Sequence, residues 1–570
     1  MSILHQSPRF RRAWLPLGTA VVASIALLLV SPALSDLQAA LAREDAARSG
    51  VGLAYWFGWY GGVSPGSYSL IVPSLSTLIG SLPLLCAATI GIAALAYPLS
   101  RSAAHPTMLA WAIAGAAVLN MMSGRVAFAV AAAITLAGVV LIQRRMLVVG
   151  AAVLVLGGCA SALAPAFIGL AVVPFVVRSL HDGGRLVWHH TGVPAADPPV
   201  VSRPDPALWA LLIGSGIGVL VPFALFGAPG SQVFPATTLF WCVLIGVGAW
   251  IALRPERGGP GAGAPDGDVD SAANVVRETA VWIAPLALAV ALALFLIPTG
   301  IGSNLSRFFC FVLPCLVLYF SRRPVRFLAI ALAPALVYSV FVATADQIAA
   351  ADVDDPEISY APLVEQLERI PGMANHRVEL VDAGTHAGSH MVAKTVKLAR
   401  GWENQSDARY NPIFYETDAL TAGSYRLWLS DNAVAYVVVS AAPMRQMKAE
   451  AELIGSGLPY LRRTWSNDDW TLYRVAEPTA IVPEPLRLVE ESPSQMVIEV
   501  PAAASYQIRI RPNRYLTAHD AADATITACV SATVDGWTEI RAPAPGRYVL
   551  AGDFSWRGVL SGEAAQCPES

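Results

Sequence analysis

Long apolar stretches separated by short polar loops fill the chain as far as residue 344. About eleven of them approach the ~20 residues that an α-helix needs to cross a bilayer. They cover residues 14–34, 70–99, 107–122, 126–142, 146–163, 166–177, 207–226, 236–253, 280–298, 308–320 and 327–344. This pattern predicts a multi-pass α-helical membrane protein, in which the short sixth and tenth stretches are re-entrant, kinked or extended at one end.

A different pattern begins after residue 345, where helical and strand periods alternate. Helices are predicted at 362–370, 420–431 and 444–454, and strands at 377–381, 433–440 and across 465–475. From about residue 481, short alternating strands separated by Pro and Gly predict a small β-sandwich. We therefore expect a transmembrane domain over 1–345, an α/β domain over 346–480 and a β-sandwich over 481–570. A polar linker over 254–277 divides the eighth span from the ninth.

Arginines fall mainly in alternate loops, and positively charged loops remain cytoplasmic. With a cytoplasmic N-terminus, the inner loops receive Arg9, Arg11, Arg12, Arg101, Arg144, Arg145, Arg178, Arg185, Arg203, Arg254, Arg257, Arg277, Arg322, Arg323 and Arg326. The outer loops receive far fewer arginines, among them Arg43, Arg125 and Arg307. An odd number of spans then places the C-terminal region outside the plasma membrane.

Composition supports this class of protein. The chain has 570 residues, of which 55% are hydrophobic and only 14% are charged, whereas soluble proteins carry about 25% charged residues. Nothing in the sequence suggests nucleic-acid binding. Cys529 and Cys567 lie in the outer region, where an oxidising compartment would permit a disulfide; the sequence leaves that pairing open.

The first candidate for chemistry is Asp36, an acidic residue just beyond the first apolar stretch. If a helix continues there, Arg43 returns to the same face, whereas Asp45 points away. Asp36, Glu44 and Asp45 are the carboxylates of the predicted outer loops before residue 345. A carboxylate at the membrane surface can act as a general base or hold a divalent metal ion. Alternatively, Asp36 simply marks where the helix leaves the lipid.

Aromatic residues are dense in the same predicted outer loop, where Trp56, Trp59 and Tyr60 accompany three glycines. Such a loop could stack against sugar rings. The competing explanation is the aromatic belt that is common at membrane interfaces.

Two further outer arginines adjoin the ends of spans, Arg125 within Ser-Gly-Arg and Arg307 within Asn304-Leu-Ser-Arg. Cations are costly at membrane depth and usually have partners. A guanidinium group can bind a lipid-linked phosphate through two parallel hydrogen bonds. An ion pair with Asp36 or Glu44, or headgroup contact, is the alternative for either arginine.

In the outer region, Arg400, Trp402 and Glu403 combine charge with an aromatic ring near turn residues. They could bind an acceptor saccharide, or form a packed loop of the α/β domain. His386 and His390 are four residues apart, but no Glu-x-x-His pattern accompanies them. The sequence contains no P-loop, Rossmann glycine fingerprint or hydrolase nucleophile elbow.

Taken in order, these motifs resemble the first outer loop of multi-pass GT-C-type glycosyltransferases. They include Asp36, the helical stretch to Arg43, the turn Trp59-Tyr-Gly-Gly and the segment from Tyr68 to Pro73. More narrowly, the chain is similar to bacterial membrane proteins labelled 6-pyruvoyl-tetrahydropterin-synthase-related and to YfhO-like lipid-sugar transferases. Ser123-Gly-Arg125, Asn304-Leu-Ser-Arg307, Arg400-Gly-Trp-Glu403 and Tyr410-Asn-Pro412 contribute to the resemblance.

The resemblance implies a transferase that uses a polyprenyl-phosphate-linked sugar donor and acts on an envelope glycan or glycolipid. Asp36 maps to the acidic residue of the first outer loop that acts as catalytic base or metal ligand in that superfamily. Because many such enzymes have paired acids there and Asp36 is followed by Leu37, the need for a divalent metal stays open. A transporter or flippase, and a non-catalytic assembly protein with a glycan-binding outer domain, are the alternatives.

Overall fold

The computed structural model describes residues 8–181, 205–228, 230–255, 268–353, 355–442, 444, 446–561 and 567. The chain divides into two compact units. The helical unit comprises Met1–Ser31, Leu82–Pro222 and Gln232–Ala345, and the mixed unit comprises Pro32–Ser81, Phe223–Ser231 and Asp346–Ser570. Half of the predicted linker over 254–277 lies outside the described residues, because the description is interrupted from 256 to 267.

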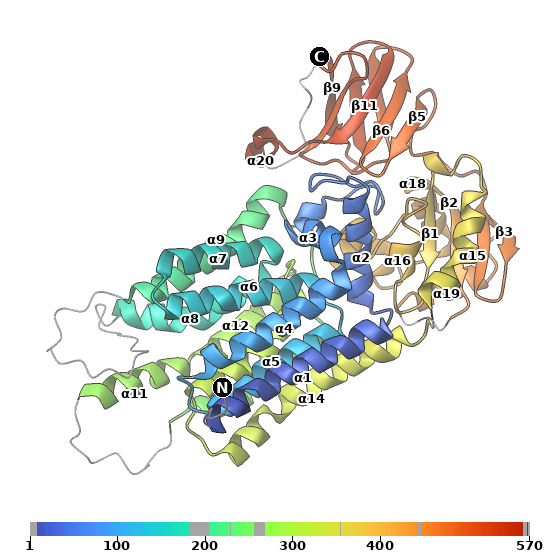
Figure 1. The fold of residues 1–570 in the computed structure, drawn as a ribbon. Helices are drawn as coiled ribbons and strands as arrows, with labels where there is room; N and C mark the ends of the chain where they lie inside the picture. The colour runs from blue at the N-terminus through green and yellow to red at the C-terminus, as the bar shows by residue number, and fades with distance from the viewer. Residues whose placement is uncertain are drawn as a thin grey trace, which may run out of the picture. The chain divides into compact units, whose positions relative to one another are not determined.

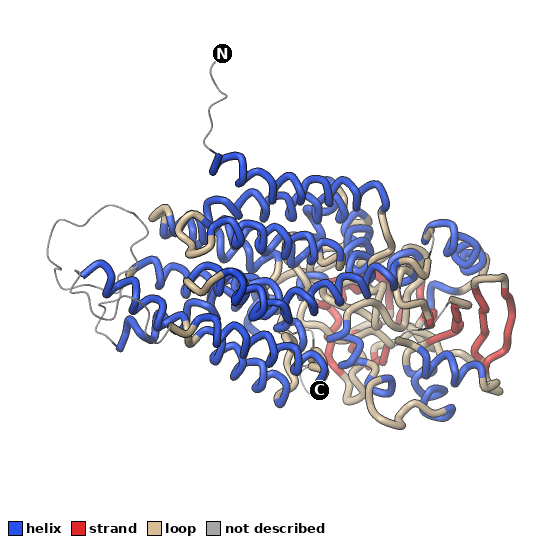
Figure 2. Tube along the Cα trace, turned by 90° about the horizontal axis from the view of Figure 1, so that it is seen from below, coloured by secondary structure: helices blue, strands red, loops and turns tan. Residues whose placement is uncertain are grey.

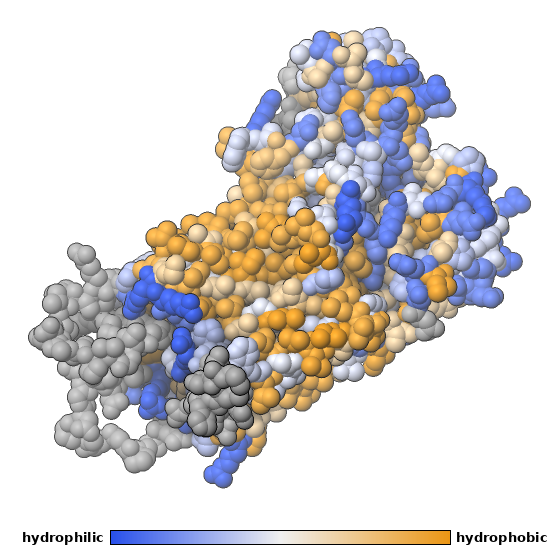
Figure 3. Space-filling model, in the orientation of Figure 1, coloured by the Kyte–Doolittle hydropathy of each residue, from blue (hydrophilic) through white to orange (hydrophobic). Residues whose placement is uncertain are grey.

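Roughly parallel and antiparallel helices form the helical unit (Figure 1, Figure 2). They are α1 (Pro8–Val30), α4 (Ser81–Ser100), α5 (Pro106–Met122), α6 (Val126–Gln143), α7 (Leu147–Ala160), α8 (Leu163–His181), α9 (Pro206–Phe226), α10 (Ala236–Leu253), α11 (Asp268–Ala280), α12 (Ile283–Leu296), η2 (Gly302–Leu305), the π-turn η3 (Phe308–Val312), α13 (Leu313–Phe320) and α14 (Val325–Ala350). Hydrophobic side chains cover most of the face of these helices that is seen in Figure 3.

Eight helices among the described residues are long and apolar enough to cross a membrane. The segment Trp14–Val30 qualifies together with Ser35–Arg48, from which it is bent by 71°. Pro106–Met122 and Leu147–Ala160 are shorter apolar helices. The multi-pass membrane class is thus confirmed. Each predicted stretch overlaps a helix, but 14–34 is helical only to Val30, and 70–99 is divided into Val72–Ile79 and Ser81–Ser100.

Three of the predicted spans have clearly different limits in the structure. The short sixth stretch extends over all of α8, and the tenth extends backwards through η3 and η2 to Gly302. The second begins later than predicted, because Gly80 ends the short helix α3 (Val72–Ile79) before α4 starts. Gly80 has a φ of 89°, in the left-handed region that glycine adopts at little cost.

In the mixed unit, a four-stranded sheet has the order β1-β2-β4-β3. It consists of β1 (Arg377–Val381), β2 (Val434–Ser440), β3 (Leu461–Ser466) and β4 (Trp470–Val475). Strands β1 and β2 are parallel, and the other pairs are antiparallel. The surrounding helices are α2 (Ser35–Arg48), η1 (Pro65–Ser67), α15 (Pro356–Glu368), η4 (Met373–Asn375), α16 (Gly388–Met391), α17 (Asn404–Tyr410), η5 (Pro412–Phe414), α18 (Ala422–Asp431) and α19 (Lys448–Gly455). The predicted α/β arrangement is confirmed.

The C-terminal strands form a second sheet, with the order β5-β6-β11-β8-β9-β10-β7. They are β5 (Arg487–Ser492), β6 (Gln495–Val500), β7 (Ala504–Ile508), β8 (Leu516–Asp520), β9 (Thr527–Ala532), β10 (Thr538–Ala542) and β11 (Gly546–Gly552), followed by α20 (Trp556–Ser561). Hydrogen bonds connect all seven strands, where we expected the two separate sheets of a sandwich. Strand β9 explains the difference, because it pairs with β8 over two residues and then with β10 over four.

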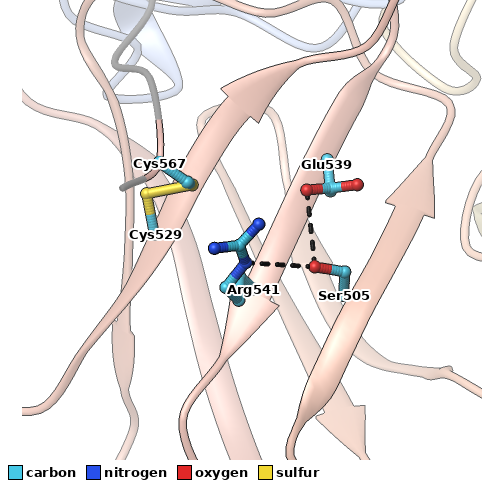
Figure 4. The surroundings of a disulfide bond; sticks show 5 residues. All are labelled: Ser505, Cys529, Glu539, Arg541 and Cys567. Carbon is cyan, nitrogen blue, oxygen red and sulfur yellow. Dashed lines mark hydrogen bonds between the residues drawn. A yellow bond between two sulfur atoms is a disulfide. The ribbon is translucent and has the colours of Figure 1, made fainter. Parts of the chain in front are cut away.

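A disulfide joins Cys529, on β9, to Cys567 (Figure 4). The pairing that the sequence left open is therefore present in the structure. Close to it, Arg541 Nε donates a hydrogen bond to Ser505 Oγ, which donates to Glu539 Oε1 (Figure 4). These bonds link β10 to β7, the edge strand of the sheet.

The segment Pro32–Ser81, which contains the first predicted outer loop, belongs to the mixed unit. Trp59 and Tyr60 pack in one cluster with Val378 and Leu380 of β1 and with Val438 of β2. Tyr55 and Phe57 pack in a second cluster with the C-terminal sheet. A segment that the sequence assigned to the transmembrane domain thus folds together with residues that lie more than 300 positions later.

Candidate functional site

Asp36 lies in the first turn of α2, on the mixed unit, and is partly exposed. The loop that follows β1 runs beside it, since Ser35 Oγ donates a hydrogen bond to the carbonyl oxygen of Gly384 at 3.1 Å. The pKa of His386 in this loop falls to about 4, chiefly because the ring is buried, and the negative charge of Asp36 opposes that fall. Asp36 is therefore close enough to His386 to interact electrostatically with it.

The predicted continuation of the helix is confirmed, and Arg43 occupies its middle. Arg43 is buried, and its Nη2 lies 3.0 Å from Glu403 Oε2. The guanidinium also lies 4.0 Å from the ring centre of Tyr68 and 5.0 Å from that of Trp59. The structure thus joins two residues that the sequence suggested separately, Arg43 and Glu403, in one buried ion pair.

The other two acids of α2 have structural partners. Glu44 accepts hydrogen bonds from Arg48 and from the backbone N–H of Ser81. Asp45 Oδ2 lies 2.7 Å from His390 Nε2 and 3.2 Å from Lys394 Nζ. Burial acts to raise the pKa of Asp45, but His390 and Lys394 outweigh it, and the pKa lies below its usual value.

Trp56, Trp59 and Tyr60 are at most 4% exposed. The indole N–H of Trp59 donates to the carbonyl oxygen of Ser389 at 3.0 Å. The hydroxyl of Tyr60 accepts a hydrogen bond from the backbone N–H of Glu403 at 3.0 Å. These rings therefore hold the loop against the segments around Ser389 and Glu403, and they present no broad face to a sugar in this structure.

A polar cavity of about 160 Å³ lies where Arg400, Trp402 and Glu403 meet α19. Its lining consists of His386, Arg400, Gly401, Trp402, Glu403, Asn404, Asp407, Phe414, Tyr415, Leu420, Gln446, Met447, Ala449 and Glu450. The ring of Trp402 stacks on that of His386, with centres 3.8 Å apart. His386 Nε2 lies 3.1 Å from Gln446 Oε1. The cavity therefore combines an aromatic surface with donors and acceptors of hydrogen bonds.

Beside this cavity, one guanidinium meets three carboxyl groups. Arg400 forms two hydrogen bonds to Asp407, at 3.0 and 2.7 Å, and one to Glu450 at 3.0 Å. Glu379 Oε1 lies 3.6 Å from the same side chain. The pKa of Glu379 is raised, chiefly by its burial and secondly by the negative charge of the adjacent Glu450. Burial also raises the pKa of Glu450. The pKa of Asp407 is lowered, because the charge of Arg400 outweighs its burial. Glu379 and Glu450 thus tend to retain a proton between them.

A second polar cavity, of about 170 Å³, lies within the helical unit. It is lined by Leu119, Ser123, Arg125, Thr238, Ser303, Asn304, Ser306, Arg307, Cys310, Phe311, Tyr338, Ser339 and Val342. Arg125 immediately precedes α6, and Arg307 immediately precedes η3. Tyr338 and Ser339 come from the second half of α14, so the cavity lies toward the end of the helices at which α14 leaves for the mixed unit. The structure thus brings Arg125, Asn304 and Arg307 together around one space.

This second cavity is suited to an anion. Its described lining residues include two arginines, an amide and several hydroxyl groups, and no carboxylate. Guanidinium groups and hydroxyl hydrogens are good donors to phosphate oxygens. Arg307 also lies over the ring of Phe128, at 5.3 Å from its centre, a favourable place for a cation.

Asp36 and the described residues around it do not form a group of ligands suited to a metal ion. No group of three or more His, Cys, Asp or Glu side chains is arranged to hold a metal ion in the described part of the chain. Ca²⁺ and Mg²⁺ prefer several oxygen ligands. We therefore derive no step through a metal ion.

Sequence reasoning missed Glu379, Asp407 and Glu450. One signal for Glu379 was available, because it is an acidic residue in the middle of a strand whose five residues are all buried. Such a group needs a partner, and that partner is Arg400. Glu450 gave no comparable signal, because it lies on a short helix between Lys448 and Glu452, where charged residues are ordinary.

No protein-family model and no curated protein matches the chain. Among solved structures, the chain is similar to the single-particle cryo-EM structure of the arabinofuranosyltransferase AftD from mycobacteria. The two share 13% sequence identity with a TM-score of 0.37, and the match covers 88% of this chain and 41% of that one. The chain therefore spans less than half the length of that protein, and the likeness is too weak to support a conclusion about either fold or function.

Proposed function

We propose that this protein is a glycosyltransferase of the GT-C type that takes a sugar from a polyprenyl-phosphate donor. We place its action at the outer face of the plasma membrane, on an envelope glycan or glycolipid. The observation that carries the proposal is the cavity shared by Arg125, Asn304 and Arg307 within a bundle of membrane-spanning helices.

Physical chemistry favours a lipid phosphate as the ligand of this cavity. Ionisable residues are rare within membrane helices, and those present often mark substrate sites. The negative charge of a phosphate leaving group grows as its bond to the sugar breaks. Two positioned guanidinium groups would stabilise that charge more in the transition state than in the bound donor.

We assign the role of general base to Asp36. It would remove the proton from an acceptor hydroxyl as the oxygen attacks the anomeric carbon, while the bond from that carbon to the phosphate oxygen breaks. This single displacement inverts the anomeric configuration. Its partial exposure and its position at the start of α2 support the assignment.

The polar cavity of the mixed unit is our candidate for binding the acceptor saccharide. Trp402 is half-buried and could contribute its ring edge, and Gln446 and Glu403 could form hydrogen bonds with sugar hydroxyls. Arg400 would act indirectly, because its guanidinium is committed to Asp407 and Glu450. We assign Arg43, Trp56, Trp59 and Tyr60 to holding α2 and its loop in place, and Glu44 to fixing the start of α4 through Ser81.

The grouping of segments in the mixed unit supports the expected topology. Its parts follow α1, α9 and α14. Because a water-exposed unit lies on one side of a membrane, the chain must cross an even number of times between Ser81 and Phe223. Six of the expected spans lie in that interval, and four more lie between Ser231 and Asp346.

Exchange of Asp36→Asn tests the catalytic assignment, with Asp45→Asn on the same helix as the control. The gene for each variant replaces the native gene in the chromosome. The envelope glycans of each strain are then analysed by mass spectrometry and compared with those of a strain that lacks the gene. We expect Asp36→Asn to reproduce the deletion phenotype at normal protein abundance, because a general base contributes a factor of about 10² to 10⁴. Asp45→Asn should preserve the glycan. A normal glycan in Asp36→Asn would remove the base from the proposal.

A lipid-phosphate flippase is the second candidate, because the same arginine-lined cavity could bind the headgroup of a lipid in transit. It requires no general base. Loss of lipid binding in arginine variants, together with full function of Asp36→Asn, would favour it.

A further inference from the structure

The C-terminal end of the chain carries an exposed aromatic surface. Phe554 is 49% exposed, Trp556 72% and Leu560 86%. Large apolar side chains seldom lie so exposed next to one another unless they face a partner or a membrane. Trp556 and Leu560 both belong to the short helix α20, and Phe554 immediately precedes it.

The packing of α20 fixes the direction of this surface. Gly558 is buried, and a side chain at this position would collide with Tyr515 and with the backbone of Arg514. Trp556 and Leu560 are four residues apart and so share one face of the helix. Each is two residues from Gly558, or about 200° around the helix, so this face points away from the sheet.

A series of ring contacts connects these residues to the end of a helix that can span a membrane. Phe226 is the last residue of α9, which is long and apolar enough to cross a membrane. Its ring centre lies 5.4 Å from that of Tyr515 and 6.2 Å from that of Phe554, and Phe554 lies 6.1 Å from Trp556. We call these four residues, Phe226, Tyr515, Phe554 and Trp556, the aromatic cluster.

Hydrogen bonds fix the cluster to the end of α9. Arg514 Nη1 donates to the carbonyl oxygen of Ala224 at 3.3 Å, and the hydroxyl of Tyr515 donates to that of Leu225. These carbonyls belong to the last turn of the helix, where no intrahelical donor remains for them. The C-terminal sheet is therefore attached at the point where a span ends.

We infer that the aromatic cluster and α20 form a membrane-docking surface, which inserts Trp556 and Leu560 into the headgroup region of the bilayer. Phe226 must lie near that region because its helix ends there, and two ring contacts connect it to Trp556. Tryptophan and tyrosine favour this depth. Arg557 is exposed on the same helix and can interact with lipid phosphates. The surface would keep the C-terminal sheet against the membrane, independently of the transferase proposal.

Fluorescence quenching by brominated lipid tests the inference. The full-length protein is placed in nanodiscs of phosphatidylcholine with either ordinary or dibrominated acyl chains, next to the variants Trp556→Ser and Trp465→Ser. Subtracting each variant's emission from that of the native protein isolates the contribution of one tryptophan. Trp465 is the control, because it lies half-buried on β3 of the other sheet.

We expect dibrominated lipid to remove more than half of the Trp556 contribution and to leave that of Trp465 unchanged. Equal emission from Trp556 in both lipids would overturn the inference. Because Trp556 is largely exposed, its removal should not disturb folding. Should Trp556→Ser nevertheless fail to fold, hydrogen exchange of the native protein decides: slow exchange of α20 in nanodiscs supports docking, and exchange as fast as in a free peptide refutes it.

Discussion

At the scale of single residues, two neighbours in the loop after β1 have pKa values that move in opposite directions. Burial raises the pKa of Asp382 to about 6, although it accepts hydrogen bonds from Tyr360, Ala383 and Gly388. Burial lowers the pKa of His386 to about 4. On acidification, protonation of Asp382 stabilises the folded state, whereas protonation of His386 favours the unfolded state.

Because the pKa of His386 is lowered by folding, acidification should destabilise the native protein, and His386→Gln tests this. Between pH 6.5 and 4 the unfolded chain binds a proton at this position and the folded chain does not, so the native protein loses stability there. The loss should reach about 2 kcal/mol at pH 5. The variant lacks this loss. It should be less stable than the native protein at pH 7, because the stacking on Trp402 is altered, and the difference should shrink at pH 5.

Thermal unfolding in nanodiscs at pH 7 and pH 5 measures this change. Trp465→Ser, on strand β3, removes no titratable group and serves as the control, which should keep a constant difference from the native protein. If the gap between His386→Gln and the native protein widened on acidification, the assigned burial of a neutral imidazole would be wrong.

A second prediction compares two arginines of α2. Arg43 is 2% exposed beside Glu403, which is 5% exposed, whereas Arg48 is 48% exposed beside Glu44. Arg43→Met should destabilise the protein by about 3 to 5 kcal/mol, because Glu403 is left buried without a partner. Arg48→Met should cost about 0 to 1 kcal/mol.

Adding Glu403→Gln to Arg43→Met should restore much of the stability, because the uncompensated charge is then removed. Denaturant titration of the three variants in mild detergent gives the comparison. Equal losses for Arg43→Met and Arg48→Met would contradict the assignment of a buried ion pair.

At the scale of elements, α2 is the helix that carries the proposed base, and α16 holds it. His390 on α16 lies 2.7 Å from Asp45 and 3.2 Å from Gln38, both on α2. This histidine therefore contacts two positions of α2 that are about two turns apart. Asp36 lies on the same helix, two residues before Gln38.

We predict that His390→Ala loosens α2 without unfolding the mixed unit. Hydrogen–deuterium exchange of Ser35–Arg48 should become faster, whereas exchange in β2 should not change. The control is His376→Ala, because His376 hydrogen-bonds to the carbonyl oxygen of Thr479, which lies outside α2. Unchanged exchange of α2 in His390→Ala would mean that other contacts, such as Arg43 with Glu403, suffice to hold it.

The sequence predicted the elements well where a regular period dominates. The strand at Arg377–Val381 has the predicted limits, and the helix predicted over 420–431 ends at Asp431 as expected, because alternation and helical spacing leave few alternatives. Pairings between distant segments could not be predicted. Neither Arg43 nor Glu403 carries any local indication of a partner 360 residues away, and the same holds for Asp45 and His390.

In the candidate sites, too, local features could be predicted from the sequence and contacts between distant segments could not. Arg125 and Arg307 could be recognised because a cation at the end of an apolar span is unusual, and the structure places both around one cavity. The aromatic loop was harder to interpret, because dense aromatics suit both a sugar platform and a core. The burial of Trp59 and Tyr60 depends on β1 and β2, which lie far away in the sequence.

At the scale of the whole molecule, segments after three different spans fold as one unit. This arrangement explains why the segment 32–81 is rich in aromatics and glycines although it connects two spans. Its residues complete the cores of both sheets. A deletion within this segment should therefore unfold the mixed unit and not merely remove a loop.

The central claim is that the cavity of Arg125 and Arg307 binds a lipid phosphate, and equilibrium binding of a polyprenyl monophosphate to the full-length protein in nanodiscs tests it most directly. Arg125→Gln and Arg307→Gln are compared with Arg101→Gln, an exposed arginine of the loop between α4 and α5. We predict that each of the first two raises the Kd at least ~10-fold, the loss of about one charge-assisted hydrogen bond, and that Arg101→Gln leaves it unchanged. The same Kd for all three variants and the native protein would contradict the account.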